Sequence, residues 1–316
     1  MSDEQTKTIV QIEKILNAPT LNLFYSLPPN SKPSKVNPLL ENEASFELGD
    51  GTIFLANYQG RSPVSLKTTK MLDFLTLQFG KVNNYDNKTD GSTNLCLTVT
   101  FSLMEYSKIL GKLNPDSAST KKDVRRIVKE ALDTIFYMSL ETTEKRRKDN
   151  VFFSKMRILQ SYSYKNSVFI VVFTESFAHY MLSSYVMNFP LNLFQIDERN
   201  KNAYSIGRKL SLHQSIYKNK NFGIERRISV RKLLEAAPAI PKIEEVRAKK
   251  GGWQSRIIDK LENALDYLHS AEILEFWEYT STRGVPLTDE QLESLDTYYD
   301  YEKLNVHFKM KGFLLE

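Results

Sequence analysis

Residues 102–138 decide the fold: SLMEYSKILGKLNPDSASTKKDVRRIVKEALDTIFYM. Ser102 and Glu105 have the spacing of a capping box, in which a hydroxyl caps the first turn of a helix and a carboxylate follows three residues later. This cap predicts a short helix that ends near Gly111, because glycine commonly terminates helices. The turn segment KLNPDSAS separates it from a second, longer helix.

The second helix is expected to run from about Thr120 to Met138, with Thr120 and Asp123 as a weaker cap. Its apolar residues recur at spacings of three and four, which is typical of one buried face. They are Val124, Ile127, Val128, Ala131, Leu132, Ile135 and Phe136. The first two to three turns carry basic residues on the other face. Two capped helices joined by a short turn, the second basic at its N-terminal end, indicate a helix-turn-helix.

Two apolar segments, residues 151–164 and 167–174, come next and are close enough to form a β-hairpin. A helix-turn-helix followed by a hairpin is the winged-helix arrangement, in which the hairpin is the wing. Residues 167–174 are apolar on both faces, so we expect this strand to be covered on both sides within its domain. Dimerisation through one face is the alternative.

The same order of elements recurs in the second half of the chain, without sequence identity between the halves. Two strands are expected to pair as a second wing around an acidic insert, residues 281–302. The expected elements are helices at residues 202–217, 229–237 and 253–269 and strands at residues 273–280 and 304–310.

These patterns predict an α+β chain of two tandem winged-helix domains. Residues 1–48 are assigned to an N-terminal helical segment and a proline-rich connector, residues 49–195 to the first domain and residues 196–316 to the second. The first domain also contains expected strands at residues 52–58 and 95–101 and an expected helix at residues 65–79.

The composition is that of a globular protein, with 316 residues, 41% hydrophobic and 26% charged. The net charge of +5 is unevenly placed. Residues 199–260 hold 16 Lys or Arg against 5 Asp or Glu, whereas residues 261–316 hold 4 against 12. A basic block followed by an acidic tail favours a surface for a polyanion in the second half of the chain. Solvated faces of long charged helices are the alternative explanation.

Several classes of site are excluded by composition and spacing. The single cysteine, Cys96, rules out a disulfide framework and a cysteine-based zinc site. The four histidines are far apart in sequence, and no GxxxxGK[ST] phosphate-binding loop occurs. The apolar run at residues 168–173 is too short to span a membrane, and the polar N-terminus does not look like a signal peptide. We therefore expect a soluble, cytoplasmic protein with no cofactor, no metal and no catalytic residues.

Five segments resemble those of the replication initiator (Rep) proteins of theta-replicating plasmids and related mobile elements. They are FSLMEYSKILG, STKKDVRRIVKEALDTIFYMSLE, MRILQSYSYKNSVFIVVFTESFAHYM, AYSIGRKLSLHQSIYKN and RIIDKLENALDYLHSAEILEFW. The resemblance covers about residues 50–280. It implies two winged-helix domains that bind successive major grooves of direct repeats at an origin. It also implies a homodimer that represses its own promoter, a monomer that initiates, and recruitment of host helicase or initiator proteins. The acidic insert departs from the simplest form of this family.

DNA binding requires cations for phosphates and side-chain donors for base edges. An Arg fork can bind O6 and N7 of guanine. For the first recognition helix we predict Lys121, Lys122, Arg125, Arg126 and Lys129 as contacts. For the second domain we predict Lys249, Lys250, Gln254, Arg256 and Lys260, with Arg226, Arg227 and Arg231 on phosphates. The basic run at residues 145–148 is either a further phosphate contact or a solvated loop.

Two other functions fit the sequence. A winged-helix transcriptional regulator would bind the same kind of DNA site without melting it. A nicking initiator would need a tyrosine nucleophile and a carboxylate-bound Mg²⁺, which Tyr298, Tyr299 or Tyr301 and the acidic insert could supply. An acidic solvated insert or a partner-docking surface is the competing explanation for that segment.

Overall fold

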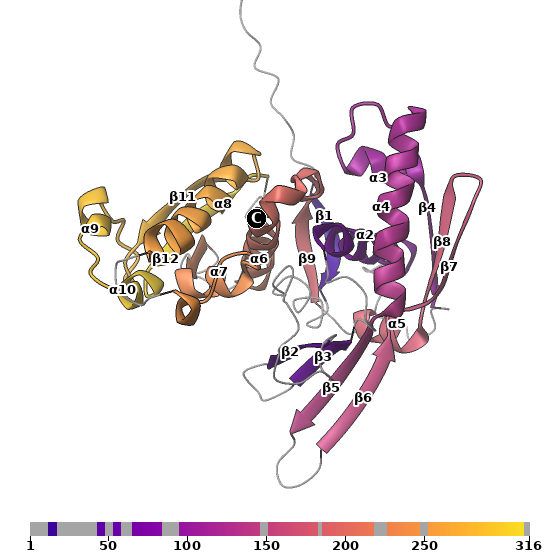
Figure 1. Cartoon of the computed structure of the whole chain (residues 1–316), viewed down its shortest axis with the longest axis horizontal. Helices are drawn as coiled ribbons and strands as arrows, with labels where there is room; N and C mark the ends of the chain where they lie inside the picture. Colours follow the sequence, from indigo (N-terminus) through magenta and orange to yellow (C-terminus); the bar gives the residue numbers. More distant parts are fainter. Residues whose placement is uncertain are drawn as a thin grey trace, which may run out of the picture. The chain divides into compact units, whose positions relative to one another are not determined.

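The computed structural model describes residues 12–17, 43–47, 53–57, 65–83, 95–145, 151–182, 185–217, 226–246 and 252–312. The chain divides into two compact units, residues 14–186 and residues 1–13 with 187–316. Each unit is a winged-helix domain with its own buried apolar residues (Figure 1). The two are described separately below.

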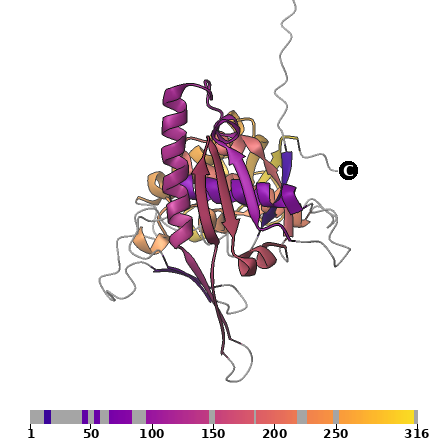
Figure 2. The ribbon, with the colours of Figure 1, turned by 90° about the vertical axis from the view of Figure 1, so that its right-hand side faces the viewer.

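In the first unit, helix α2 (Leu66–Asn83) is followed by strand β4 (Thr98–Ser102) and the helix-turn-helix of α3 (Leu103–Ile109) and α4 (Ala118–Tyr137). Strands β7 (Leu159–Lys165) and β8 (Val168–Phe173) complete it as the wing. The three strands form an antiparallel sheet in the order β4-β8-β7. Figure 2 shows α4 standing alongside this sheet. The buried aromatic rings of Phe74, Phe101 and Phe169 join α2 to the inner face of the sheet.

The tight turn of this wing has a local cause. Asn166 and Ser167 adopt φ values of 51° and 65°, the left-handed conformation that a two-residue type I′ hairpin turn requires at both positions. Asparagine tolerates this conformation better than most residues.

A four-stranded sheet also lies in the first unit, in the order β2-β3-β5-β6. Its strands are β2 (Glu43–Glu47), β3 (Ile53–Asn57), β5 (Ser139–Lys145) and β6 (Val151–Arg157). The β5–β6 hairpin is inserted between α4 and the wing. Helix α5 (Glu175–Leu182) follows the wing.

The second unit repeats the same order: helix α6 (Lys201–Tyr217), strand β10 (Arg227–Ser229), helix α7 (Val230–Ala236), helix α8 (Asp259–Ser270) and strands β11 (Leu274–Thr280) and β12 (Asn305–Met310). Its sheet order, β10-β12-β11, matches β4-β8-β7 position by position. A π-helical turn, Gln254–Ile258, leads into α8. The insert between β11 and β12 contains two short helices, α9 (Asp289–Glu293) and α10 (Tyr298–Glu302).

The predicted fold class is confirmed, and four local expectations are corrected. The N-terminal segment expected to be helical contains strand β1 (Ile12–Asn17), which pairs with β9 (Tyr185–Pro190). The proline-rich connector at residues 27–38 lies outside the described residues. The expected strand at residues 151–164 is two strands in different sheets, β6 and β7, with a break at Ile158.

The other two corrections concern α4 and β8. The N-cap of α4 is Ser117, whose hydroxyl accepts from the Thr120 backbone N–H at 3.1 Å, rather than Thr120 or Asp123. Strand β8 is covered on one side only: Phe169, Val171 and Phe173 are buried, whereas Ile170 on the outer face is 38% exposed.

Candidate nucleic-acid interface

Helix α4 presents the predicted basic residues of the first domain to solvent. Its buried stripe anchors it to α2 and α3. The Ser117 hydroxyl caps the first turn of α4. Lys121 and Lys122 lie in the next turn. The opposite face is exposed at Lys122, Arg125, Arg126 and Lys129 and half-exposed at Lys121. The structure therefore brings all five predicted residues together on one helix.

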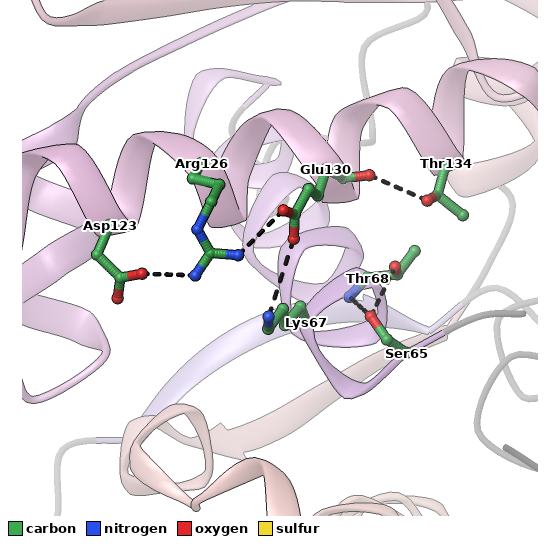
Figure 3. A network of polar contacts seen from close by, with 7 residues as sticks. All are labelled: Ser65, Lys67, Thr68, Asp123, Arg126, Glu130 and Thr134. Atoms are coloured by element: carbon green, nitrogen blue, oxygen red, sulfur yellow. Dashed lines mark hydrogen bonds and ion pairs between the residues drawn. The ribbon is translucent and has the colours of Figure 1, made fainter. Parts of the chain in front are cut away.

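Arg126 is the centre of a polar network on this face (Figure 3). One Nη donates to Asp123 at 2.6 Å and the other to Glu130 at 3.0 Å. Glu130 also pairs with Lys67 of α2 at 3.9 Å. The hydrogen bond to Asp123, followed by that to Glu130, raises the pKa of Arg126 above its ordinary value. Each terminal nitrogen of the guanidinium thus donates to a different carboxylate.

Two other basic residues of α4 are connected to the wing, Lys129 through Asp133 of the same helix and Arg125 directly. Lys129 pairs with Asp133 at 3.0 Å, and the Tyr162 hydroxyl of β7 donates to the same carboxylate. Arg125 lies over the ring of Tyr164 at 5.9 Å, which is a cation–π distance. The wing therefore orients one flank of the helix.

The N-terminal turns of α4 hold the less constrained cations. Lys121 pairs with Asp116 at 3.2 Å. Lys122 makes no hydrogen bond or ion pair with any residue in the described part of the chain. A flexible ammonium without an internal partner is well suited to phosphate contact.

Helix α8 and the turn before it are less basic than α4. Lys260 is exposed, as are Gln254 and Arg256 on the π-helical turn. Gln254 donates to Asp259 at 3.0 Å, and Arg256 reaches the Glu245 carbonyl at 3.5 Å. Lys249 and Lys250 lie outside the described residues, so their placement stays a prediction.

The three arginines predicted to bind phosphates are not on α8. Arg226 and Arg227 are half-buried at the start of the domain's sheet, and Arg231 is exposed on α7, paired with Glu235 at 3.3 Å. The Arg227 guanidinium packs against Gly284 of the insert, where a Cβ would come within 2.0 Å of its Nη. The half-buried Arg227 side chain thus also packs against the first residues of the insert that follows β11.

The insert is folded onto the domain through an aromatic cluster that the sequence analysis did not identify. Tyr298 and Tyr301 are buried, and both contact Trp253 at the start of the recognition helix. The Tyr301 and Tyr279 hydroxyls are 2.7 Å apart. Burial, the largest cause, raises the pKa of both tyrosines. Of the three tyrosines considered as nucleophiles, Tyr299 alone is exposed, at 53%.

Within the described residues, no three His, Cys, Asp or Glu side chains are grouped as metal ligands would be. None of the described helices is long and apolar enough to cross a bilayer.

No protein-family model and no curated protein sequence matches the chain. Among solved structures, the crystal structure of the Pi initiator protein in complex with iteron DNA aligns with a TM-score of 0.52 and 12% identity, over 95% of this chain and 98% of that one. The chain has the fold of the Pi initiator protein. The resemblance to replication initiators is confirmed at the level of the fold.

Two structures of RctB domains 2 and 3 are also similar. One aligns with a TM-score of 0.47 and 11% identity, over 92% of this chain and 96% of that one. The other, a selenomethionine derivative, has a TM-score of 0.46 and 13% identity, over 90% and 95%.

Helices α4 and α8 have equivalent positions in their domains. Helix α4 follows β4 and α3, and α8 follows β10 and α7. Seven of the thirteen predicted contact residues lie on α4, α8 or on the turn that leads into α8 and are exposed; Lys121 on α4 is half-exposed. The exposed and half-exposed residues together are Lys121, Lys122, Arg125, Arg126, Lys129, Gln254, Arg256 and Lys260.

Proposed function

We propose that this protein is a sequence-specific double-stranded DNA-binding replication initiator that acts at repeated sites of an origin. The observation that carries the proposal is the repeated domain: one chain contains two winged-helix domains of the same topology, each exposing a recognition helix with basic residues. The Pi initiator protein, which shares this fold, is bound to iteron DNA in its crystal structure.

Each recognition helix enters a major groove, and the two grooves are about one helical turn, or ~10 base pairs, apart. Lys122 and Lys260 contact phosphates, as do Arg226, Arg227 and Arg231. The Arg side chains of α4, and Gln254 and Arg256 on the turn before α8, contact base edges. Recruitment of host helicase and self-association as a homodimer complete the proposed role, as the family resemblance implies. Initiation in this form needs no catalysis by the chain itself.

The test is fluorescence anisotropy with the full chain and labelled duplexes that tile the DNA around its own coding sequence. We expect tight binding to a repeated element, with an affinity at least ~10³-fold above that for a scrambled duplex. The logarithm of the affinity should fall steeply with the logarithm of salt concentration, because phosphate contacts release counterions. Weak binding without preference would contradict the proposal.

A second measurement separates an initiator from a transcriptional regulator. Permanganate reactivity of unpaired thymines reports melting of an A·T-rich segment beside the bound repeats. An initiator is expected to produce reactive thymines on supercoiled DNA, whereas a regulator leaves the duplex paired.

A further inference from the structure

On the exposed face of α4, the side chain of Arg126 lies between two carboxylates. Arg126 is 55% exposed, and its partners Asp123 and Glu130 are 47% and 52% exposed. All three side chains are therefore accessible to a duplex in front of the helix. With Lys67, which pairs with Glu130, the network holds two cations and two carboxylates, so it has no net positive charge to attract a phosphate.

Carboxylates at this position disfavour non-specific binding. A DNA backbone that approaches the helix at random brings phosphates toward Asp123 and Glu130, and like charges repel. A base edge in the major groove has no formal charge and offers acceptors as well as donors. The network therefore favours contact with bases over contact with phosphates.

The network also restricts Arg126 without exhausting its donors. A guanidinium has five N–H groups, and the hydrogen bonds to Asp123 and Glu130 use one from each terminal nitrogen. Three N–H groups remain, and a guanine needs two of them for O6 and N7. Because Glu130 is in turn paired with Lys67 of α2, the clamp is fixed to the body of the domain rather than to the helix alone.

We propose that Arg126 is the principal base-contacting residue of the first recognition helix, and that Asp123 and Glu130 are positioning residues which hold its guanidinium for guanine and keep it from phosphates. This inference rests on the proposed function and adds which residue sets sequence preference. Lys122, by contrast, supplies affinity that does not depend on sequence.

Two substitutions of Arg126 separate base contact from charge. Arg126→Lys keeps the positive charge but cannot form a two-pronged contact with guanine. Arg126→Ala removes both. If Arg126 contacted only phosphates, the Lys variant would bind like the wild type.

The experiment begins with selection of bound duplexes from a pool with ~20 randomised base pairs, about two helical turns, using the full-length wild-type chain. The selected duplex and a scrambled duplex of equal composition are then titrated with each variant. Asp123→Asn and Glu130→Gln test the clamp. Glu175→Gln is the matched control, because this carboxylate is 78% exposed on a different helix, α5, and its loss changes the net charge equally.

We expect Asp123→Asn and Glu130→Gln to bind scrambled DNA more tightly and to lower the ratio of selected to scrambled affinity about ten-fold. Arg126→Lys should lower the same ratio, and repeating the selection with it should remove the preference for G at one position. Glu175→Gln should leave the ratio within about two-fold of the wild type. Thermal melting of each variant verifies that it is folded.

An unchanged ratio in folded Asp123→Asn, Glu130→Gln and Arg126→Lys would overturn the inference and assign the network to packing of α4 on α2. Failure of the wild type to enrich any sequence would instead contradict the proposed function. The two failures are thus distinguishable.

Discussion

Lys122 is the simplest residue on α4 to test, because among the described residues no ion pair has to be broken to free it for DNA. We expect Lys122→Ala to weaken binding to specific and scrambled duplexes by a similar factor. The slope of log affinity against log salt should fall by about 1, the value for one lost phosphate contact. A change in base preference without a change in slope would show that Lys122 contacts bases instead.

Tyr301 is expected to serve stability rather than DNA chemistry. Tyr301→Phe removes the buried hydroxyl pair with Tyr279 and should lower the free energy of unfolding of the second domain by about 1 kcal/mol. Tyr299→Phe is the matched control, because its exposed side chain should change stability little. Both tryptophans, Trp253 and Trp277, lie in this domain, so tryptophan fluorescence in urea follows its unfolding selectively.

Alkaline pH provides a further test of the buried tyrosine pair. The pKa of Tyr279 and Tyr301 is raised in the folded state, chiefly by burial, above the ordinary value of about 10. Their contribution to stability is therefore fully present below about pH 10 and is lost as the pH rises further. The urea midpoint should fall as the pH rises from about 10 to about 11, and it should fall less in Tyr301→Phe. An equal fall of the urea midpoint with pH in the wild type and in Tyr301→Phe would argue against a role of this tyrosine pair.

Residue types and spacings predicted the basic residues of α4 but not the ion pairs and ring contacts that orient their side chains. Asp123 and Glu130 lie three and four residues from Arg126, so helical spacing alone could have identified this network. The contacts of Asp133 with Tyr162 and of Arg125 with Tyr164 could not be found in this way, because they join α4 to a strand distant in sequence.

At the scale of the element, the start of α4 depends on one hydroxyl. Ser117→Ala should lower the free energy of unfolding by about 1 kcal/mol, because the Thr120 N–H loses its acceptor. Fraying of the first turn should also weaken DNA binding, since Lys121 and Lys122 follow directly. Urea denaturation and anisotropy measure the two effects. Ser117→Asp, which keeps a side-chain acceptor at the cap, is the control, and an equal loss in both variants would exclude a capping effect.

Long periodic helices were predictable, and short or composite elements were not. Periodicity located α4, α6 and α8 within a few residues because each has a continuous buried stripe. Strand β10 has three residues, too few for alternation to show. The segment at residues 151–164 was predicted as one strand because β6 and β7 have similar composition. The sequence therefore did not show that the chain leaves one sheet and enters another between them.

The insert between β11 and β12 illustrates a related limit. Its carboxylates are conspicuous in the sequence, whereas the tyrosines that fold it onto Trp253 lie 45 and 48 positions further along the chain than that residue. Only tertiary contacts distinguish a packed insert from a solvated loop.

At the scale of the whole molecule, two separate cores predict that one domain survives without the other. A chain truncated after Gln195 keeps β9, the partner of β1, together with residues 187–195 of the second unit, and loses α6, α7, α8 and the sheet of that unit. We expect it to remain folded by circular dichroism, to bind the selected duplex much more weakly and to protect about one helical turn instead of two in footprinting. Full affinity in the truncated chain would mean that the second domain has another role.

The repeated topology was predictable from the order of helices and strands, because the same succession occurs twice. The N-terminal strand β1 was not, since its partner β9 lies more than 160 residues away and its own six residues carry no decisive pattern. Local sequence specifies such a strand weakly, and pairing completes it.

The repeated domain also has a consequence for symmetry. A two-fold dimer of identical recognition helices matches a palindrome, which looks the same from both strands. This chain carries two unequal helices, α4 with five basic residues and α8 with two when the turn before it is included, and a two-fold axis interchanges only identical elements. On the proposed function, a bound monomer has a head and a tail on the duplex. Sites arranged head to tail would then align every bound copy in one direction and give the origin a polarity.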